Sequence, residues 1–132
     1  MTLALRPLPS LEHVPTQAEF ELFARISGDD NPIHVDPAFS ARTRFGRTVA
    51  HGMMLYSLVW GHLRRVLGPV EERGQSLMFP APSFAGEALR IDAAITAIDG
   101  DEATVEVTVT RIADGSVGCR STTRLVAKEG TR

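Results

Sequence analysis

A run of seventeen residues, HGMMLYSLVWGHLRRVL at positions 51–67, limits the fold of this chain more than any other segment. Its middle part, Met53 to Trp60, is apolar on almost every side, with Tyr56 and Ser57 as the exceptions. A helix that is apolar all round is enclosed by other protein, and Gly68-Pro69 marks the end of this one. We therefore expect the rest of the chain to wrap around a central helix.

Downstream of this segment, apolar residues recur at every second position, which is typical of half-buried strands. Two such sets are present: Leu89, Ile91, Ala93, Ile95 and Ala97, and then Val105, Val107 and Val109. Asp99-Gly100 and Asp114-Gly115 are hairpin turn signals. The pattern predicts an antiparallel meander with strands at about Glu87–Ile98, Glu102–Ile112 and Ser116–Val126. An earlier strand is expected near Gln75–Phe79, which gives an α+β fold whose sheet wraps the helix.

The N-terminal part of the chain predicts two further helices. Thr16 and Glu19 have the spacing of a capping box, in which each side chain accepts a hydrogen bond from the backbone N–H of the other residue. Gly28 stands where this helix would end in a left-handed residue. Asp36-Pro37 predicts the start of a second helix, which Gly46 would end.

The bulk composition favours a single globular domain over residues 1–132. No apolar run approaches the roughly 20 residues needed to span a bilayer, and the N-terminal residues lack a signal-peptide pattern, so no membrane partner is expected. The single cysteine, Cys119, fits a reducing compartment and thus a cytoplasmic location. A net charge of −2 without a long basic run gives no reason to expect nucleic acid as a partner.

The loop SGDDNPIHVD, Ser27 to Asp36, carries the residues with the most reactive chemistry. Gly, Asp, Asn and Pro are common in turns for conformational reasons, so a solvated polar loop is one interpretation. An extended chain would separate Asp29 from His34 by roughly 16 Å, whereas a turn at Asn31-Pro32 folds them toward one point. A carboxylate and an imidazole that share one water supply an acid and a base, as hydration or dehydration chemistry requires. The second interpretation is therefore an active site.

Two segments resemble the MaoC-like, (R)-specific enoyl-CoA hydratase family: FARISGDDNPIHVDPAF at residues 23–39 and AHGMMLYS at residues 50–57. The pattern Ser-Gly-Asp, any residue, Asn-Pro, an aliphatic residue and His is long, and His-Gly-Met follows at the distance expected of the family. This family has the hot-dog fold, in which an antiparallel sheet wraps a long central helix. The resemblance covers most of the chain and implies the same architecture that the apolar pattern predicts.

The resemblance also implies roles for particular residues. Asp29 and His34 would be the catalytic pair that holds and activates a water molecule, and Asn31 would orient their loop. Gly52 would be the third catalytic residue, because its N–H at the start of the central helix can hydrogen-bond the thioester carbonyl oxygen. Ser57 matches a serine near the site in relatives, with a hydrogen bond to a carbonyl of its own helix as the alternative.

Three arginines follow the motif and suit the phosphates of coenzyme A, with a solvated basic face as the alternative: Arg42, Arg44 and Arg47. His51 precedes the helix glycine, and we expect its ring to hydrogen-bond a loop carbonyl. The other histidines lack metal-ligand spacing, so no metal is expected. No cofactor is expected either, apart from the coenzyme A of the substrate.

These implications predict reversible addition of water to a trans-2-enoyl-CoA, which gives the (R)-3-hydroxyacyl-CoA. One alternative is a dehydratase of acyl-chain elongation that acts on a carrier-protein thioester or with a different partner subunit. Another is a thioesterase, although hot-dog thioesterases lack this motif. A non-catalytic acyl-thioester binder is a further alternative, but it would not need both Asp29 and His34. Single hot-dog domains usually pair, so a homodimer with the substrate at its interface is expected.

Overall fold

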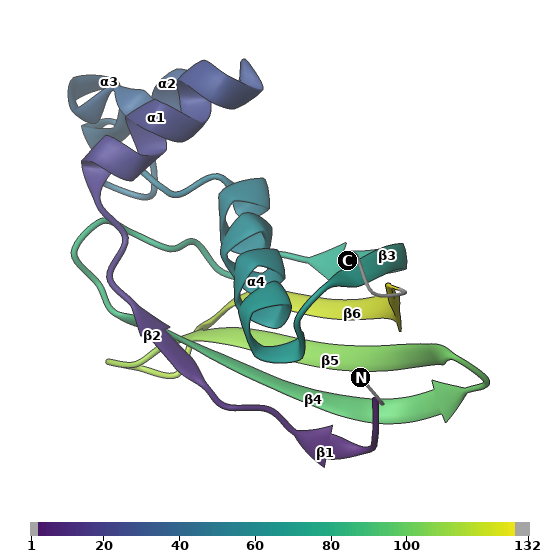
Figure 1. The fold of residues 1–132 in the computed structure, drawn as a ribbon. Helices are drawn as coiled ribbons and strands as arrows, with labels where there is room; N and C mark the ends of the chain where they lie inside the picture. The colour runs from purple at the N-terminus through teal and green to yellow at the C-terminus, as the bar shows by residue number, and fades with distance from the viewer. Residues whose placement is uncertain (1–2, 129–132) are drawn as a thin grey trace.

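In a computed structural model, which describes residues 3–128, a six-stranded antiparallel sheet packs against helix α4 (Gly52–Leu67) (Figure 1). The strand order is β1-β4-β5-β6-β3, and β2 also pairs with β4. The strands are β1 (Arg6–Pro7), β2 (Leu11–His13), β3 (Val70–Met78), β4 (Leu89–Asp99), β5 (Glu102–Arg111) and β6 (Val117–Ala127). The ends of the domain predicted over residues 1–132 lie outside the described residues, so that span stays a prediction.

The core forms where the alternating face of the meander meets α4. In the antiparallel register Ile91 pairs with Val109 and Ile95 with Val105, and all four side chains are buried. Apolar residues of α4 face them, and Val59, Leu63 and Leu67 are among those without exposed surface. Burial of this apolar area is the main force that holds the helix on the sheet.

The three meander strands lie within two residues of their predicted bounds, because alternation and hairpin signals agree there. The strand expected near Gln75–Phe79 is longer at its start and runs from Val70 to Met78 as β3. Strands β1 and β2 are not predicted from the sequence. Both are short edge strands paired with β4, and neither has enough residues to show an apolar period.

Helices α1 (Gln17–Ser27), α2 (Pro32–Val35) and α3 (Pro37–Ala41) form a separate layer beyond α4, away from the sheet (Figure 1). Both hydrogen bonds of the capping box between Thr16 and Glu19 are present at the start of α1. Gly28 closes α1 with a φ of 82°, a left-handed conformation that favours glycine. These features of α1 confirm the sequence prediction.

The prediction that the second helix continues to Gly46 is wrong, because α3 ends at Ala41. The Thr43 hydroxyl and backbone N–H both bind the carbonyl of Ser40, at 2.7 and 3.0 Å, which tightens the chain into turns. The turn expected at Asn31-Pro32 is itself the start of the helical turn α2, with Asn31 as its N-cap and Pro32 in its first turn.

The expectation that α4 is enclosed on all sides is wrong for the single chain. Met53 is 46% exposed, and Ser57 is exposed one turn further on, so one face of the helix has no cover. Within residues 3–128, no helix is long and apolar enough to cross a bilayer.

Candidate active site

The loop after α1 is organised by short side-chain to backbone hydrogen bonds. The Asp29 N–H donates to Ser27 Oγ at 3.1 Å, and the Asn31 N–H donates to Asp29 Oδ1 at 3.4 Å. Asn31 Oδ1 in turn accepts from the Ile33 N–H at 3.1 Å. These local bonds are the alternative to helix that Ser, Asp and Asn offer the backbone, and they turn the chain between Asp29 and α2.

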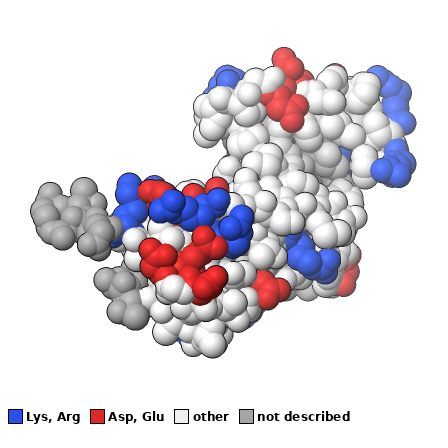
Figure 2. Space-filling view, turned by 90° about the vertical axis from the view of Figure 1, so that its right-hand side faces the viewer, with Lys and Arg blue, Asp and Glu red and all other residues white. Residues whose placement is uncertain are grey.

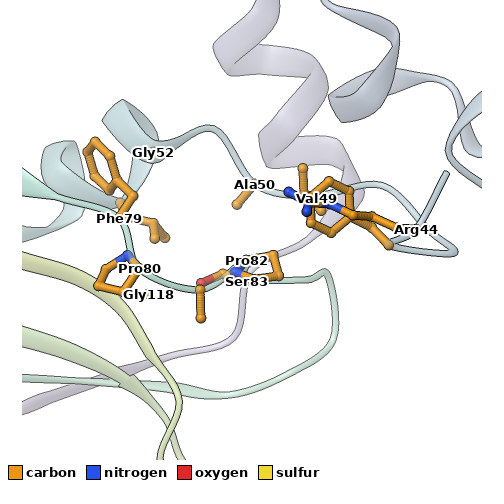
Figure 3. A pocket seen from close by; sticks show the side chains of 12 residues that line it. Arg44, Val49, Ala50, Gly52, Phe79, Pro80, Pro82, Ser83 and Gly118 are labelled. Carbon is orange, nitrogen blue, oxygen red and sulfur yellow. The ribbon is translucent and has the colours of Figure 1, made fainter.

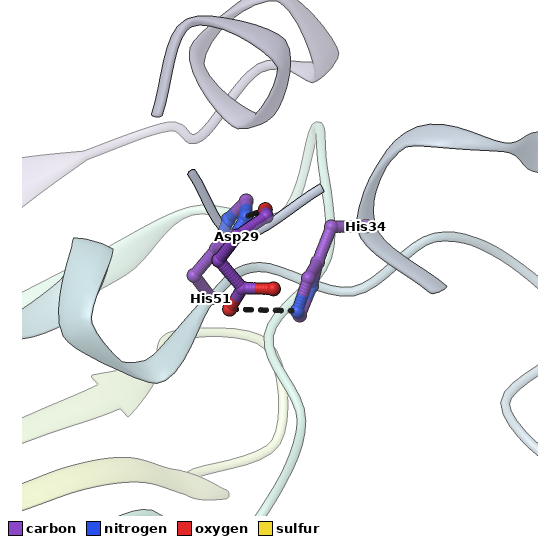
Figure 4. A group of neighbouring side chains, drawn as sticks. All are labelled: Asp29, His34 and His51. Atoms are coloured by element: carbon purple, nitrogen blue, oxygen red, sulfur yellow. Dashed lines mark hydrogen bonds and ion pairs between the residues drawn. The ribbon is translucent and has the colours of Figure 1, made fainter. Parts of the chain in front are cut away.

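The turn brings the two polar residues singled out by the sequence within 4 Å. Asp29 Oδ2 lies 3.8 Å from His34 Nε2, and Figure 4 shows the carboxylate facing the imidazole. The separation is too long for a direct hydrogen bond, but one water molecule could lie within about 3 Å of both atoms. The His34 side chain is 14% exposed and that of Asp29 55%, so solvent reaches this point from the Asp29 side.

His34 is held from both its ring and its backbone. Its Nδ1 lies 2.8 Å from the Val49 carbonyl oxygen, so Nδ1 carries the hydrogen and the neutral ring leaves Nε2 free to accept. Gln17 Nε2 donates to the His34 carbonyl at 2.9 Å, and the Thr48 hydroxyl donates to Gln17 Oε1 at 2.5 Å. Gln17 and Thr48 carry no sequence signal that marks them as part of the site, because contacts across 17 and 31 residues leave no local pattern.

His51 forms the floor of the site and confirms its predicted bond to a loop carbonyl. Its Nε2 lies 2.9 Å from the Asp29 carbonyl oxygen, and its ring stacks on His34 with 3.8 Å between centroids and 23° between planes (Figure 4). The Phe23 ring packs against it at 4.8 Å. Desolvation by burial is the main cause that lowers the pKa of His51.

Asp29, His34 and His51 each have one possible metal-ligand atom, and these atoms lie within 4.8 Å of one another. A metal ion lies near the plane of each imidazole that binds it, along the nitrogen lone pair. The two rings are nearly parallel at 3.8 Å, so their lone pairs point side by side rather than at one atom. His51 Nε2 is also occupied by the Asp29 carbonyl. The donor set therefore fits a shared ion poorly.

Gly52 begins α4 immediately after His51. No side chain caps this helix start, and the first N–H groups of a helix have no acceptor within it. A Cβ on Gly52 would lie 2.9 Å from the Phe79 ring, so only glycine allows the ring to pack there. The helix start thus offers a polar N–H with partial positive charge beside an apolar ring.

A pocket of about 230 Å³ opens beside this helix start. Gly52 and Phe79 lie at one end and Arg44 at the other, with Pro80, Pro82 and Ser83 between them (Figure 3). Asp29 and His34 do not line it, but Val49 does, and its carbonyl holds the His34 ring. The pocket therefore reaches the helix start and the residues that flank the Asp29 and His34 pair.

The remaining candidate residues lie apart from the pair. Ser57 is exposed on α4 and donates to the Met53 carbonyl at 2.8 Å, which is its predicted alternative bond. Arg42 is exposed at the end of α3. Arg44 lines the pocket, with its guanidinium carbon 4.8 Å from the Phe45 ring centroid.

Arg47 is engaged by its neighbours. It forms a 2.7 Å ion pair with Glu87, and its guanidinium carbon lies 3.9 Å from the Phe84 ring centroid. Arg44 is therefore the arginine of the three whose surroundings best suit a ligand, and phosphate binding by any of them stays a prediction.

An antiparallel sheet around a central helix, with an Asp and His loop at the helix start, defines a class of hot-dog proteins. The chain belongs to the MaoC-like domain family, whose model matches residues 5–117. This confirms the family and the fold that the sequence motif implied.

Within this family, the chain is similar to proteins named as hydratases and dehydratases. The chain is 43% identical to an (R)-specific enoyl-CoA hydratase of Aeromonas caviae over 98 residues, which cover 72% of each protein. A solved structure of the (R)-hydratase from A. caviae involved in PHA biosynthesis superposes with a TM-score of 0.89 and 31% identity, over 96% of this chain and 98% of that one. A 3-hydroxyacyl-thioester dehydratase Z of Mycobacterium tuberculosis is 34% identical over 101 residues, which cover 71% of this chain and 67% of that protein.

Proposed function

We propose that this chain is an (R)-specific enoyl-CoA hydratase, which adds water reversibly to trans-2-enoyl-CoA to give (R)-3-hydroxyacyl-CoA. The observation that carries the proposal is the 3.8 Å gap between Asp29 Oδ2 and His34 Nε2, which suits one shared water molecule. The relatives named as hydratase and dehydratase support the same reaction class.

Both atoms that face the gap accept hydrogen bonds, so a water between them donates one hydrogen to each. The water oxygen forms a bond to C3, and one of its O–H bonds breaks as the proton passes to Asp29 or His34. The electron pair of the double bond moves toward the thioester carbonyl. A proton then returns to C2 from the same side, by way of the same pair of residues. The Gly52 N–H stabilises the negative charge on the thioester oxygen, which lets C2 accept the proton last.

The pocket between Gly52 and Arg44 supports a path for the coenzyme A part of the substrate. One end of the pocket lies at the helix start, where the thioester carbonyl would bind, and its apolar walls suit the uncharged pantetheine arm. Arg44 at the opposite end suits a phosphate. No cofactor beyond this coenzyme A is proposed.

A homodimer is the proposed assembly. Strand β3 lies at one end of the sheet, and within residues 3–128 no strand pairs with its outer side. Figure 2 shows a broad region without charged side chains between the helical layer and the mixed-sign cluster over the sheet. An unpaired edge and the open face of α4 at Met53 both favour cover by a second copy. A cytoplasmic location stays a prediction.

The second candidate function is the reverse reaction, dehydration of a 3-hydroxyacyl thioester on a carrier protein. The similarity to the M. tuberculosis dehydratase favours it, since the same acid and base pair serves both directions.

The test is an assay of purified protein with crotonyl-CoA and longer trans-2-enoyl-CoAs. Loss of the enoyl absorbance, the configuration of the product and release of free thiol are measured together. The proposal predicts the (R)-3-hydroxyacyl-CoA with the thioester intact. Free thiol would indicate a thioesterase, and binding without turnover of CoA or carrier-protein substrates would indicate an acyl-thioester binder.

A further inference from the structure

His51 contacts both Asp29 and His34 and is itself enclosed by the fold, with 2% of its surface exposed. We infer that His51 is a positioning residue, which holds Asp29 and His34 in the relative geometry that water activation requires. The inference rests on the proposed hydratase function. The Nε2–H of His51 is taken by the Asp29 backbone carbonyl, so it is not available to the shared water.

The contact with Asp29 acts through the backbone. Asp29 is exposed, and the bonds around it come from Ser27 and Asn31, which belong to the same exposed loop. The 2.9 Å bond from His51 Nε2–H to the Asp29 carbonyl differs, because it ties the loop to a buried residue 22 positions away. A hydrogen bond to a buried, fixed donor restrains the loop more than bonds within the loop do. His51 thereby limits where the Asp29 carboxylate can lie.

The contact with His34 acts on the ring. The Val49 carbonyl fixes one ring nitrogen of His34 and leaves rotation about that bond possible. The stacked His51 ring, 3.8 Å away and tilted by only 23°, restricts this rotation. Phe23 packs against His51 in turn, so the stack is anchored in α1. These contacts keep Nε2 directed toward Asp29.

The protonation state of His51 suits this role. Its Nε2 carries the hydrogen that Asp29 accepts, and within residues 3–128 its buried Nδ1 has no hydrogen-bond partner. A proton on Nδ1 would place a buried charge without a partner. The titratable groups that face His51 are Asp29 and His34, while Phe23 is apolar. Because His51 is neutral, it adds no charge next to Asp29 and His34.

The same residue links the pair to the helix start. His51 is the N-cap residue of α4 and directly precedes Gly52. The backbone of His51 is bonded to the Gly52 nitrogen and its side chain donates to the Asp29 carbonyl, so His51 connects the helix start to the Asp29 loop. The proposed acid, base and oxyanion donor are therefore aligned through one buried side chain and its backbone.

Two matched variants separate the hydrogen bond from simple filling of space. In His51→Gln the amide nitrogen can take the place of Nε2 and donate to Asp29, whereas His51→Met has a similar size and no donor. We expect His51→Met to lower kcat by about 100-fold, as for a misplacement of about 1 Å, with KM changed less than about threefold. His51→Gln should recover at least about tenfold of that loss. Circular dichroism and thermal unfolding check that both variants are folded.

Equal kcat in the two folded variants, or a loss that appears in KM alone, would overturn the inference. A structural role would lower the yield and stability of both variants without this split between Gln and Met. His51→Phe keeps an aromatic stack without a donor, and a kcat between those of the Gln and Met variants is expected for it.

A measurement on the wild-type protein keeps the test decisive if the variants do not fold. Nitrogen NMR of histidine-labelled protein should show His51 neutral with hydrogen on Nε2, and His34 with hydrogen on Nδ1, near pH 7. Another tautomer of His51, or a charged ring, would overturn the inference. If the wild type hydrates no enoyl thioester, the proposed function fails separately. In that case a change in the orientation of the His34 ring in His51→Met, measured by NMR, still tests the positioning role.

Discussion

Asp29 and His34 differ in how firmly each is held, and this difference affects how they can act on a water molecule. His34 is fixed at its ring by Val49 and His51 and at its carbonyl by Gln17. Asp29 lies at the surface and is restrained mainly through its backbone. A fixed imidazole beside a solvent-facing carboxylate lets water and substrate enter from one side while the imidazole keeps its direction.

The lowered pKa of His51 predicts how stability depends on pH. Its usual pKa is 6.5, and burial lowers that value in the folded protein, so below pH 6.5 the unfolded chain binds more protons. The free energy of unfolding should therefore fall as the pH drops from 6.5 through the folded pKa. Urea unfolding at pH 8, 6.5 and 5 measures this dependence.

The control for this prediction is His51→Gln, which removes the titrating group. The histidines at positions 13, 34 and 62 remain in both proteins, so the difference between the two pH profiles reports His51. The variant should lose less stability between pH 6.5 and 5 than the wild type does. Identical slopes in the two proteins would contradict the prediction.

At the scale of elements, the start of α4 joins the active-site loop to the sheet. Gly52 contacts Phe79, which follows β3, while His51 contacts the loop after α1. The first backbone N–H groups of a helix have no acceptor inside it, and no side chain caps this helix start. The position of one helix end thus determines both the oxyanion donor and one wall of the pocket.

Substitution of Gly52 by Ala tests this junction. The new Cβ would lie 2.9 Å from the Phe79 ring, so the exposed ring must move or the helix start must shift. We expect a destabilisation of about 1–3 kcal/mol from overpacking, together with reduced hydratase rate. The double variant Gly52→Ala with Phe79→Ala should recover most of the stability, as measured by urea unfolding. Equal destabilisation in the single and double variants would place the strain elsewhere.

The sequence predicts the elements well where two local signals agree. Thr16 and Gly28 mark the two ends of α1, and glycines in the turns mark the ends of the meander strands. The prediction of a helix end from the sequence fails where a side chain has several possible hydrogen-bond partners nearby. Thr43 is an example, because its hydroxyl bonds to the Ser40 carbonyl and α3 ends earlier than predicted. An apolar pattern in the sequence does not distinguish burial within one chain from burial against a second chain. For this reason the pattern predicts that Met53 is enclosed, whereas it is exposed in the single chain.

The pairing of Asp29 with His34 can be predicted from the sequence, because the two residues lie in one short motif and the turn between them is formed by residues of that motif. The residues that hold this pair in place are harder to predict from the sequence. The bond from His51 to a loop carbonyl could be expected, but the stack on His34 and the role of Gln17 depend on packing between separate elements. The arginines show the same limit, since the ion pair of Arg47 with Glu87 joins residues 40 positions apart.

At the scale of the whole molecule, the unpaired edge of β3 and the open face of α4 predict a homodimer. Met53→Glu would place a charge on the open face and should shift the mass toward the monomer in light scattering. Ile112→Glu is the matched control, because Ile112 is 48% exposed, like Met53 at 46%, and lies beyond the end of β5. A monomeric wild type, or equal effects of both variants, would contradict the prediction.

The central claim is that Asp29 and His34 activate a shared water for hydration, and neighbouring aspartates allow a direct measurement. Asp29→Asn and Asp30→Asn make the same chemical change at adjacent exposed positions, but Asp29 alone of the two faces His34. With crotonyl-CoA, the account predicts that Asp29→Asn lowers kcat by about 100- to 10,000-fold while Asp30→Asn stays near the wild-type rate. Near-normal (R)-specific hydration by a folded Asp29→Asn variant would contradict the account.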